Sequence, residues 1–232
     1  MLGTFLLAFG AHPDDVELGA GGLCALHAPD GVVVCDLTQA EMSTNGDPIT
    51  RRKEALASAD ILGISERICL SIPDRGIVIN EDSIASVVRV IRTYRPEVIV
   101  APMTSDRHPD HGACARLIYE AFFTSGLRRY DDGLAPHRPK AMYHYMINSV
   151  DKASFVVDVS HVYDKKRAAL AQYRSQFVKA EGVDTPITRG SFMPMIEGRD
   201  RYFGQQTGVA YAEGFWREEP IVVSSLAATL AP

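Results

Sequence analysis

The segment Phe5-Leu-Leu-Ala-Phe-Gly-Ala-His-Pro-Asp-Asp-Val-Glu17 decides the fold, because an apolar run passes directly into a polar loop. The run is far too short to span a bilayer, and no basic residue precedes it as in a secretory signal. It therefore predicts a buried first strand at 4–10. The Gly-rich stretch after the loop leads into a helical pattern at 19–28. A strand, a polar loop and a helix in this order begin an α/β unit.

The same alternation continues through the chain. Short apolar, β-branched runs predict further strands, and longer patterns rich in helix formers predict helices; the strands are 32–37, 67–72, 97–102, 142–147 and 155–159, and the helices 49–62, 81–94, 112–124 and 162–176. This order is typical of a parallel sheet with right-handed crossovers. We therefore expect one α/β domain over 1–232, with a Rossmann-like, mostly parallel sheet and helices on both faces. Residues of about 178–215 are expected to form a loop or cap over the ligand-binding edge.

Composition argues against several classes of partner. The 232 residues are 46% hydrophobic, which is enough for a full core, and the formal net charge is only -5. No block of Lys or Arg occurs that would bind phosphate backbones or anionic lipids, so we expect neither nucleic acid nor membrane as partner. The cysteines are dispersed and form no CxxC pattern, which favours core thiols in a cytoplasmic protein.

The loop after the first strand carries His12, Asp14 and Asp15. Ligands bind at the carboxyl ends of the strands in an open parallel sheet, so these side chains lie where a site is expected. An imidazole and a carboxylate three residues apart, on a turn restricted by Pro13, can reach one cation. The other aspartate is then free to act as a base. Aspartate is also a favoured helix N-cap, and that simpler interpretation stays open.

A second polar loop, Asp106-Arg-His-Pro-Asp-His-Gly112, follows the strand predicted at 97–102. In the Rossmann-like order 3-2-1-4-5-6, the first and fourth strands are neighbours, so the two loops should face each other. Two histidines and one aspartate would leave zinc an open position for water and substrate, as a catalytic site requires. The same ligands also suit Fe2+. The alternative is a polar surface loop with structural histidines.

Together these motifs resemble the LmbE-like, or PIG-L, superfamily of zinc N-deacetylases, which act on N-acetylglucosaminyl compounds. The resemblance runs from Phe5 to about Val222 and is closest to the branch that deacetylates N-acetylglucosaminyl malate in bacillithiol biosynthesis. The stretches that carry it are Ala11-His-Pro-Asp-Asp15, Cys35-Asp-Leu-Thr38, Pro73-Asp-Arg-Gly76, Asp106–Gly112, Tyr145-Met-Ile-Asn148, Ser175-Gln-Phe177 and Tyr211-Ala-Glu-Gly-Phe215.

The resemblance implies a role for each matching position. His12, Asp15 and His111 correspond to the zinc ligands, and Asp14 corresponds to the general base. His108, oriented by Asp110, would be the electrophilic or acid partner beside the scissile amide. Zinc would polarise the acetyl carbonyl and lower the pKa of water, so that hydrolysis gives acetate and a free amine.

Substrate contacts are less closely defined. Arg52 and Arg138 match family arginines near the substrate, and each also fits an ordinary exposed arginine. Asn45 lies in the loop after the second strand, where it either contacts sugar hydroxyls or forms a polar turn. Ser191 stands where related members carry a tyrosine. Oxyanion stabilisation would then come from His108 and zinc alone, or from another loop residue.

The expected activity is zinc-dependent hydrolysis of the N-acetyl group of an N-acetylglucosaminyl conjugate, with the L-malate conjugate as first candidate. The resemblance also implies a homo-oligomer, specifically a hexamer. A deacetylase of another N-acetyl sugar and a non-catalytic zinc- or carbohydrate-binding protein of the same fold are the alternatives.

Two other classes fit poorly. A dinucleotide-binding module would use Gly19, Gly21 and Asp36, but Cys24 stands at the third glycine of its fingerprint. A serine hydrolase would need a G-x-S-x-G elbow, which does not occur in the sequence.

Overall fold

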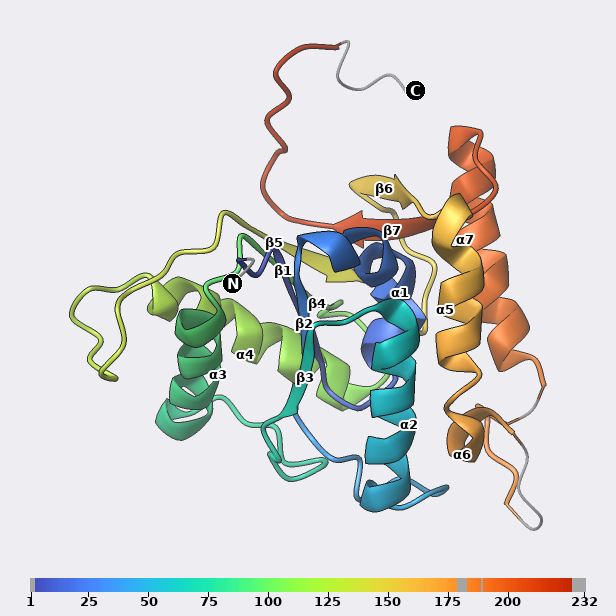
Figure 1. The fold of residues 1–232 in the computed structure, drawn as a ribbon, viewed down its shortest axis with the longest axis horizontal. Coiled ribbons are helices and arrows are strands. Elements are labelled where there is room, and N and C mark those ends of the chain that lie inside the picture. Colours follow the sequence, from blue (N-terminus) through green and yellow to red (C-terminus); the bar gives the residue numbers. More distant parts are fainter. Residues whose placement is uncertain (1–2, 179–182, 189, 227–232) are drawn as a thin grey trace.

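The computed structural model of the chain describes residues 3–178, 183–188 and 190–226. Within these ranges one mixed sheet lies between two layers of helices (Figure 1), which confirms the predicted fold class. The strands are β1 Leu6–Gly10, β2 Val32–Asp36, β3 Glu66–Cys69, β4 Val98–Pro102, β5 Ala141–Tyr145, β6 Phe155–Asp158 and β7 Ala212–Trp216.

The helices divide between the two faces of the sheet (Figure 1). They are α1 Asp15–His27, α2 Pro48–Leu62, α3 Glu81–Tyr94, α4 Pro109–Ser125, α5 Tyr163–Leu170, α6 Arg174–Phe177 and α7 Phe192–Thr207. Helices α3 and α4 cover one face, and α1, α2, α5 and α7 cover the other. None of the helices in the described part of the chain is long and apolar enough to cross a membrane.

The strand order is β3-β2-β1-β4-β5-β7-β6. The first five strands in this order are parallel, as predicted, and β1 lies between β2 and β4. The predicted place of β6 beside β5 is wrong, because β7 inserts between them and is antiparallel to both. β7 was not predicted, since its sequence Ala-Glu-Gly-Phe-Trp places a charged residue inside the sheet.

The later helices also differ from the prediction. The helix expected at 162–176 is split into α5 and α6 by a turn. The region of 178–215, expected as a loop or cap, contains α7 and most of β7 among its described residues. Residues 179–182 and 189 of that region lie outside the described residues.

The glycines near the start of α1 allow it to pack closely on the rest of the protein. A Cβ on Gly19 would lie 2.0 Å from Cδ2 of Tyr145, and one on Gly22 would lie 2.7 Å from Cβ of Val159. The helix is also kinked at Ala20, where φ is -141°. Gly19 and Gly22 therefore have packing roles, and Gly19 is one of the two glycines that match the dinucleotide fingerprint.

A buried ionic cluster fixes the kinked helix. The Lys166 ammonium lies 2.6 Å from Oδ2 of Asp200 and 2.7 Å from Oε1 of Glu213, and all three side chains are 0% exposed. The Glu213 carboxylate also accepts hydrogen bonds from the backbone N–H groups of Gly22 and Leu23, at 2.8 and 2.7 Å. The cluster thus joins α5, α7 and β7 to α1, the helix that begins with Asp15.

Replacing Lys166 with Met tests this cluster. The substitution leaves the Glu213 carboxylate buried without a cation and leaves Asp200 with Arg199 alone, so we expect it to lower the free energy of unfolding by about 3–5 kcal/mol. Urea denaturation monitored by circular dichroism measures the change. Lys140→Met is the control, because Lys140 pairs with Glu97 at 2.7 Å on the surface; its effect should not exceed about 1 kcal/mol. Equal losses in the two variants would show that the buried cluster has no special stabilising role.

Candidate metal and catalytic site

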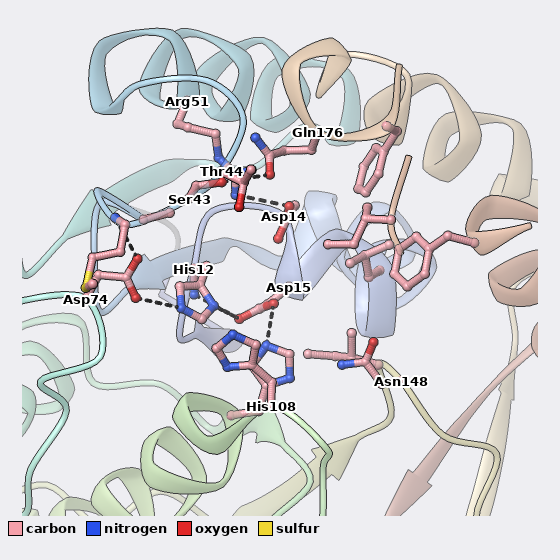
Figure 2. A pocket seen from close by; sticks show the side chains of 18 of the residues that line it. His12, Asp14, Asp15, Ser43, Thr44, Arg51, Asp74, His108, Asn148 and Gln176 are labelled. Carbon is pink, nitrogen blue, oxygen red and sulfur yellow. Dashed lines mark hydrogen bonds and ion pairs between the residues drawn. The ribbon is translucent and has the colours of Figure 1, made fainter. Parts of the chain in front are cut away.

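A cavity of about 350 Å³ opens at the carboxyl ends of the central strands (Figure 2). His12 comes from the loop after β1, and His108 and His111 come from the loop after β4 and the start of α4. The ring centroids of His12 and His108 are 4.8 Å apart, and those of His12 and His111 are 5.6 Å apart. The two motifs therefore lie close together, as expected from the neighbouring positions of the first and fourth strands in the sheet.

Asp15 lies between the two histidines expected to bind metal. Its Oδ1 is 3.0 Å from Nε2 of His111, and its Oδ2 is 3.4 Å from Nδ1 of His12. One ring nitrogen each of His12, His108 and His111 lie within 4.8 Å of one another. Ligand atoms about 2.0–2.1 Å from a tetrahedral zinc ion lie about 3.3 Å apart. The distances from the Asp15 oxygens to the nearest nitrogens of His12 and His111 are close to this value.

The other ring nitrogen of each histidine faces an outer carboxylate. Nε2 of His12 is 3.2 Å from Oδ1 of Asp74 and 3.4 Å from Oδ2 of Asp110. Nδ1 of His111 is 3.0 Å from Oδ1 of Asp106, although the angle is not that of a hydrogen bond. Metal-ligating histidines usually present their second nitrogen to a carboxylate or carbonyl in this way. The donor set of His12, Asp15 and His111 therefore fits zinc or Fe2+.

The electrostatics of the site also favour a cation. Although burial opposes the charged form, the Asp15 and Asp106 carboxylates raise the pKa of His111 to about 9. Against the effect of burial, His111 and His12 hold the pKa of Asp15 well below its usual range. The carboxylates thus stabilise positive charge between them, which a bound metal ion would supply.

Asp14 points into the cavity in an unusual backbone conformation. It occupies the N-cap position of α1 with φ of 114°, but its side chain makes no capping hydrogen bond. Its Oδ2 accepts instead from Nη2 of Arg51 at 3.0 Å, and Arg51 also donates to the Pro13 carbonyl. Burial raises the pKa of Asp14 to about 6, although Arg51 opposes the rise. Such a carboxylate can accept a proton near neutral pH, so the capping interpretation does not describe its side chain.

The predicted link between Asp110 and His108 exists only through the backbone. The Asp110 N–H donates to Nδ1 of His108 at 3.3 Å. The Asp110 carboxylate faces His12 instead and accepts from Nη1 of Arg75 at 2.6 Å. Because Nδ1 is an acceptor, the neutral His108 ring carries its proton on Nε2. Burial, then the nearby His111 and His12, lower the pKa of His108.

The arginines expected near the substrate lie elsewhere. Arg52 is exposed and lines a separate cavity beside Asp36 and Cys69. Its neighbour Arg51 is 2% exposed and lines the cavity with the histidines. One step along a helix turns a side chain by about 100°, so only one of two adjacent arginines can face the site. Arg138 is exposed, with its guanidinium 5.6 Å from the ring centre of Phe123, and does not line the cavity.

Asn45 and Ser191 lie at the margin of the site. Asn45 is buried and lines an adjoining cavity of about 390 Å³, which His108 also lines. Ser191 is exposed at the N-cap of α7, and neither cavity includes it. The next residue, Phe192, is buried and lines the main cavity instead.

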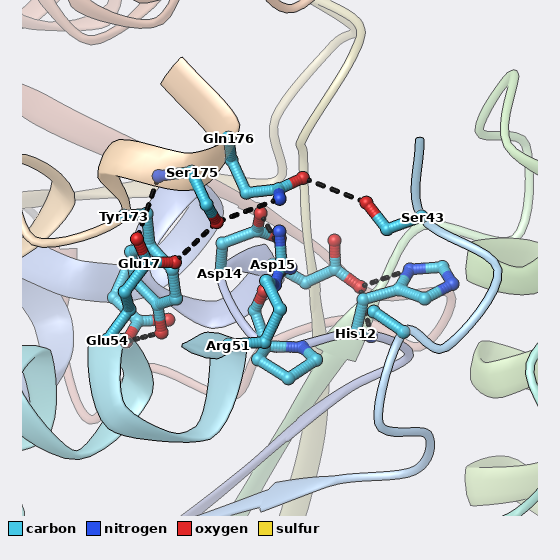
Figure 3. A network of polar contacts seen from close by, with 12 residues as sticks. His12, Asp14, Asp15, Glu17, Ser43, Arg51, Glu54, Tyr173, Ser175 and Gln176 are labelled. Atoms are coloured by element: carbon cyan, nitrogen blue, oxygen red, sulfur yellow. Dashed lines mark hydrogen bonds and ion pairs between the residues drawn. The ribbon is translucent and has the colours of Figure 1, made fainter. Parts of the chain in front are cut away.

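A chain of polar contacts closes the cavity above Asp14 and Arg51 (Figure 3). The Ser175 N–H and hydroxyl donate to the Glu54 carboxylate, both at 2.7 Å. The Gln176 side chain accepts from the Ser43 hydroxyl at 3.2 Å and donates to the Asn45 carbonyl at 2.5 Å. Helix α6 is thereby attached to α2 and to the loop after β2.

Sequence reasoning assigned no role to Arg51, Asp74, Asp106 or Gln176. Asp74 could have been found, because it follows β3 at the same edge as the other loops. Asp106 lies within the second motif but two residues before its first histidine. Gln176 lies in the matching stretch Ser175-Gln-Phe177, but only the tertiary structure shows that α6 reaches the cavity. Asp36, the acidic residue of the dinucleotide alternative, is bound by Arg67 at 2.7 and 2.9 Å and is not available to a ribose.

The chain is similar in sequence to known deacetylases. Residues 7–122 match the family model described as GlcNAc-PI de-N-acetylase, PIG-L. The diacetylchitobiose deacetylase of Thermococcus kodakarensis is 28% identical over 226 residues, which cover 90% of this chain and 81% of that protein. The probable N-acetyl-alpha-D-glucosaminyl L-malate deacetylase 2 of Bacillus subtilis is 26% identical over 184 residues, covering 71% of this chain and 80% of that protein.

A solved structure extends the match over nearly the whole chain. The conserved protein TT1542 from Thermus thermophilus has a TM-score of 0.85 and 34% sequence identity. The alignment covers 95% of this chain and 97% of that one. The two proteins therefore share the fold over nearly all of both chains.

The outer carboxylates give a test of the metal site that does not depend on turnover. Asp106→Asn keeps the shape of the side chain but removes the charge facing His111, so zinc affinity should fall by about 10-fold to 100-fold. Competition with a fluorescent chelator measures the affinity. Asp60→Asn, on the exposed side of α2, is the control and should leave it unchanged. Unchanged affinity in Asp106→Asn would mean that this carboxylate does not orient the ligand.

Proposed function

The chain belongs to the PIG-L family of GlcNAc-PI de-N-acetylases, and from this premise we propose that it removes the acetyl group from an N-acetylglucosaminyl conjugate in a zinc-dependent reaction. One observation carries the proposal: Asp15 joins His12 and His111 at the edge of the sheet, and the buried Asp14 carboxylate lies beside them. The L-malate conjugate, used in bacillithiol biosynthesis, is the first candidate substrate.

His12, Asp15 and His111 would hold the metal. When bound there, zinc would polarise the acetyl carbonyl and lower the pKa of water. The carboxylates of Asp74, Asp110 and Asp106 would keep the two imidazoles oriented through their second nitrogens. Fe2+ remains an alternative metal for this donor set.

The protein's own groups would move the protons. Asp14 would take a proton from water as the oxygen attacks the carbonyl carbon, and its raised pKa suits that role. His108 would donate a hydrogen bond from Nε2 to the developing oxyanion. As the carbon–nitrogen bond breaks, the proton held by Asp14 passes to the nitrogen. The products are acetate and a free amino sugar.

Arg51 takes the substrate-binding role first assigned to Arg52. It is buried, yet its Nε and Nη1 have no hydrogen-bond partner among the described residues. A guanidinium that lines the cavity suits a carboxylate, and malate carries two. Arg107 is exposed and lines both adjoining cavities, where it can meet the second carboxylate. Ser43 and Thr44 line the same cavities and offer hydroxyls to the sugar.

We also propose that the protein is a cytoplasmic homo-oligomer, specifically a hexamer. Family resemblance is the basis for this assembly. The exposed aromatic side chains of Tyr119 and Phe123, four residues apart on α4, support association between copies.

Free-amine release from N-acetylglucosaminyl malate tests the activity. The wild-type protein should release amine when loaded with zinc and lose this activity after treatment with a chelator. Release from N,N'-diacetylchitobiose but not from the malate conjugate would favour another N-acetyl sugar as substrate. No release from either compound would favour a non-catalytic binding protein.

Asp14→Ala tests the base. Without the carboxylate, turnover should fall by at least about 100-fold, while the zinc content stays at the wild-type value because the metal ligands are intact. Amine release and elemental analysis of the same preparation measure the two quantities. If most of the activity survived, Asp14 could not be the base.

Two adjacent arginines provide a matched pair for substrate recognition. Arg51→Met should reduce kcat/KM for the malate conjugate by about 10-fold to 100-fold more than for N-acetylglucosamine. Only the conjugate carries carboxylates, and these lose their charged partner when the guanidinium is removed. Arg52→Met should leave both values near wild type. Equal losses on both substrates in Arg51→Met would show instead that Arg51 acts by holding Asp14.

A further inference from the structure

The cavity has two chemically different walls. One carries the polar side chains of Ser43, Thr44, Arg51, Asp74 and Gln176, which gather around Asp14 and His12 in Figure 2. The other is apolar and consists of Leu18, Ile147, Phe177, Ile187 and Phe192. These apolar residues belong to one hydrophobic cluster under the site. A substrate with a polar and an apolar part can therefore bind in only one favourable orientation.

The apolar wall borders the catalytic carboxylates. Leu18 is 3% exposed and lies on α1 three residues after Asp15, hence on the same face of the helix. Ile147 is 1% exposed and precedes Asn148, whose side-chain amide donates to Asp106 at 2.9 Å. The wall thus lies next to residues of both motifs, Asp15 and Asp106.

Phe192 closes the end of this wall. It is 6% exposed, and its ring stacks on Phe177 with centroids 5.9 Å apart and an interplanar angle of 23°. It begins α7, so the helix backbone fixes its position. Its neighbour Ser191 occupies the position of the family tyrosine and does not enter the cavity. In this chain a large apolar ring, rather than a phenol, therefore limits the cavity at this point.

We propose that Leu18, Ile147 and Phe192 form the pocket for the acyl group, and that Phe192 sets the length of acyl chain that the enzyme accepts. The inference rests on the proposed function. The acyl methyl is bonded to the carbon that water attacks, so it must contact whatever surface borders Asp14 and the metal ligands. The sugar hydroxyls would then face the polar wall, where they find hydrogen-bond partners.

The pocket should discriminate sharply by chain length. A buried methylene contributes about 0.8 kcal/mol, or about fourfold in kcat/KM, where there is room for it. Where there is no room, one extra methylene reduces kcat/KM by about 10-fold to 200-fold. Because Phe192 ends the apolar wall and its ring is held against Phe177, we expect the second case for acyl groups longer than acetyl.

A series of N-acetyl, N-propionyl and N-butyryl derivatives of the same glucosaminyl malate tests the proposal. The wild-type enzyme should prefer acetyl over butyryl by at least about 10-fold per methylene. Phe192→Ala and the milder Phe192→Leu should narrow this ratio by about 10-fold, mainly by raising kcat/KM for the longer chains. If Phe192→Ala does not fold, Phe192→Leu carries the test.

Ile196→Ala is the matched control. Ile196 is 1% exposed and belongs to the same helix and hydrophobic cluster as Phe192, but it does not line the cavity. Its substitution should lower the thermal midpoint and leave the acyl preference unchanged. The control thus separates loss of core packing from a change of the pocket.

The possible outcomes distinguish this inference from the function on which it depends. An unchanged acyl preference in folded Phe192 variants would overturn it, as would an equal rise of KM for every chain length, which would place the sugar ring against Phe192. Failure of the wild-type enzyme to release amine from any of the derivatives would overturn the proposed function itself.

Discussion

The contact of Asp15 with both His12 and His111 is the interaction on which the site depends. It joins the loops after β1 and β4, which are adjacent in the sheet but far apart in the sequence. Further carboxylates, from Asp74 and Asp106, face the outer nitrogens of the same rings. So much buried negative charge is unfavourable unless positive charge lies within it. The imidazoles alone supply that charge only when protonated, whereas a divalent cation between them would supply it while both rings are neutral.

The scaffold keeps these groups in place from behind the site. Helix α1 begins at Asp15, and Glu213 binds the N–H groups at its kink while Lys166 neutralises the carboxylate. On the other side, Tyr173 donates to Glu17 of the same helix at 2.8 Å. The C-terminal part of the chain therefore does not only border the cavity. It also fixes the orientation of α1, the helix that carries the proposed metal ligand Asp15. The elements α5, α7 and β7, which follow the second motif in the sequence, therefore help to position α1.

The sequence predicted the parts of the molecule that depend on local pattern and on topology. Apolar runs located the strands up to β6, and the edge rule for parallel sheets brought the loops of His12 and His111 together. β7 escaped prediction because Glu213, buried in the ionic cluster with Lys166, interrupts its apolar pattern. The choice between Arg51 and Arg52 depended on a rotation of one residue, which a motif does not fix. Gln176 and Phe192 reach the cavity only through tertiary packing.

The backbone at Asp14 explains how two adjacent aspartates can serve different purposes. With φ of 114°, a conformation that disfavours any side chain, Asp14 turns away from the helix that Asp15 begins. Such a conformation is unfavourable by about 1–3 kcal/mol and persists only where the surroundings determine it. Here Arg51 does so by binding both the Asp14 carboxylate and the Pro13 carbonyl. Asp15 is thus left to the metal ligands while Asp14 faces the cavity.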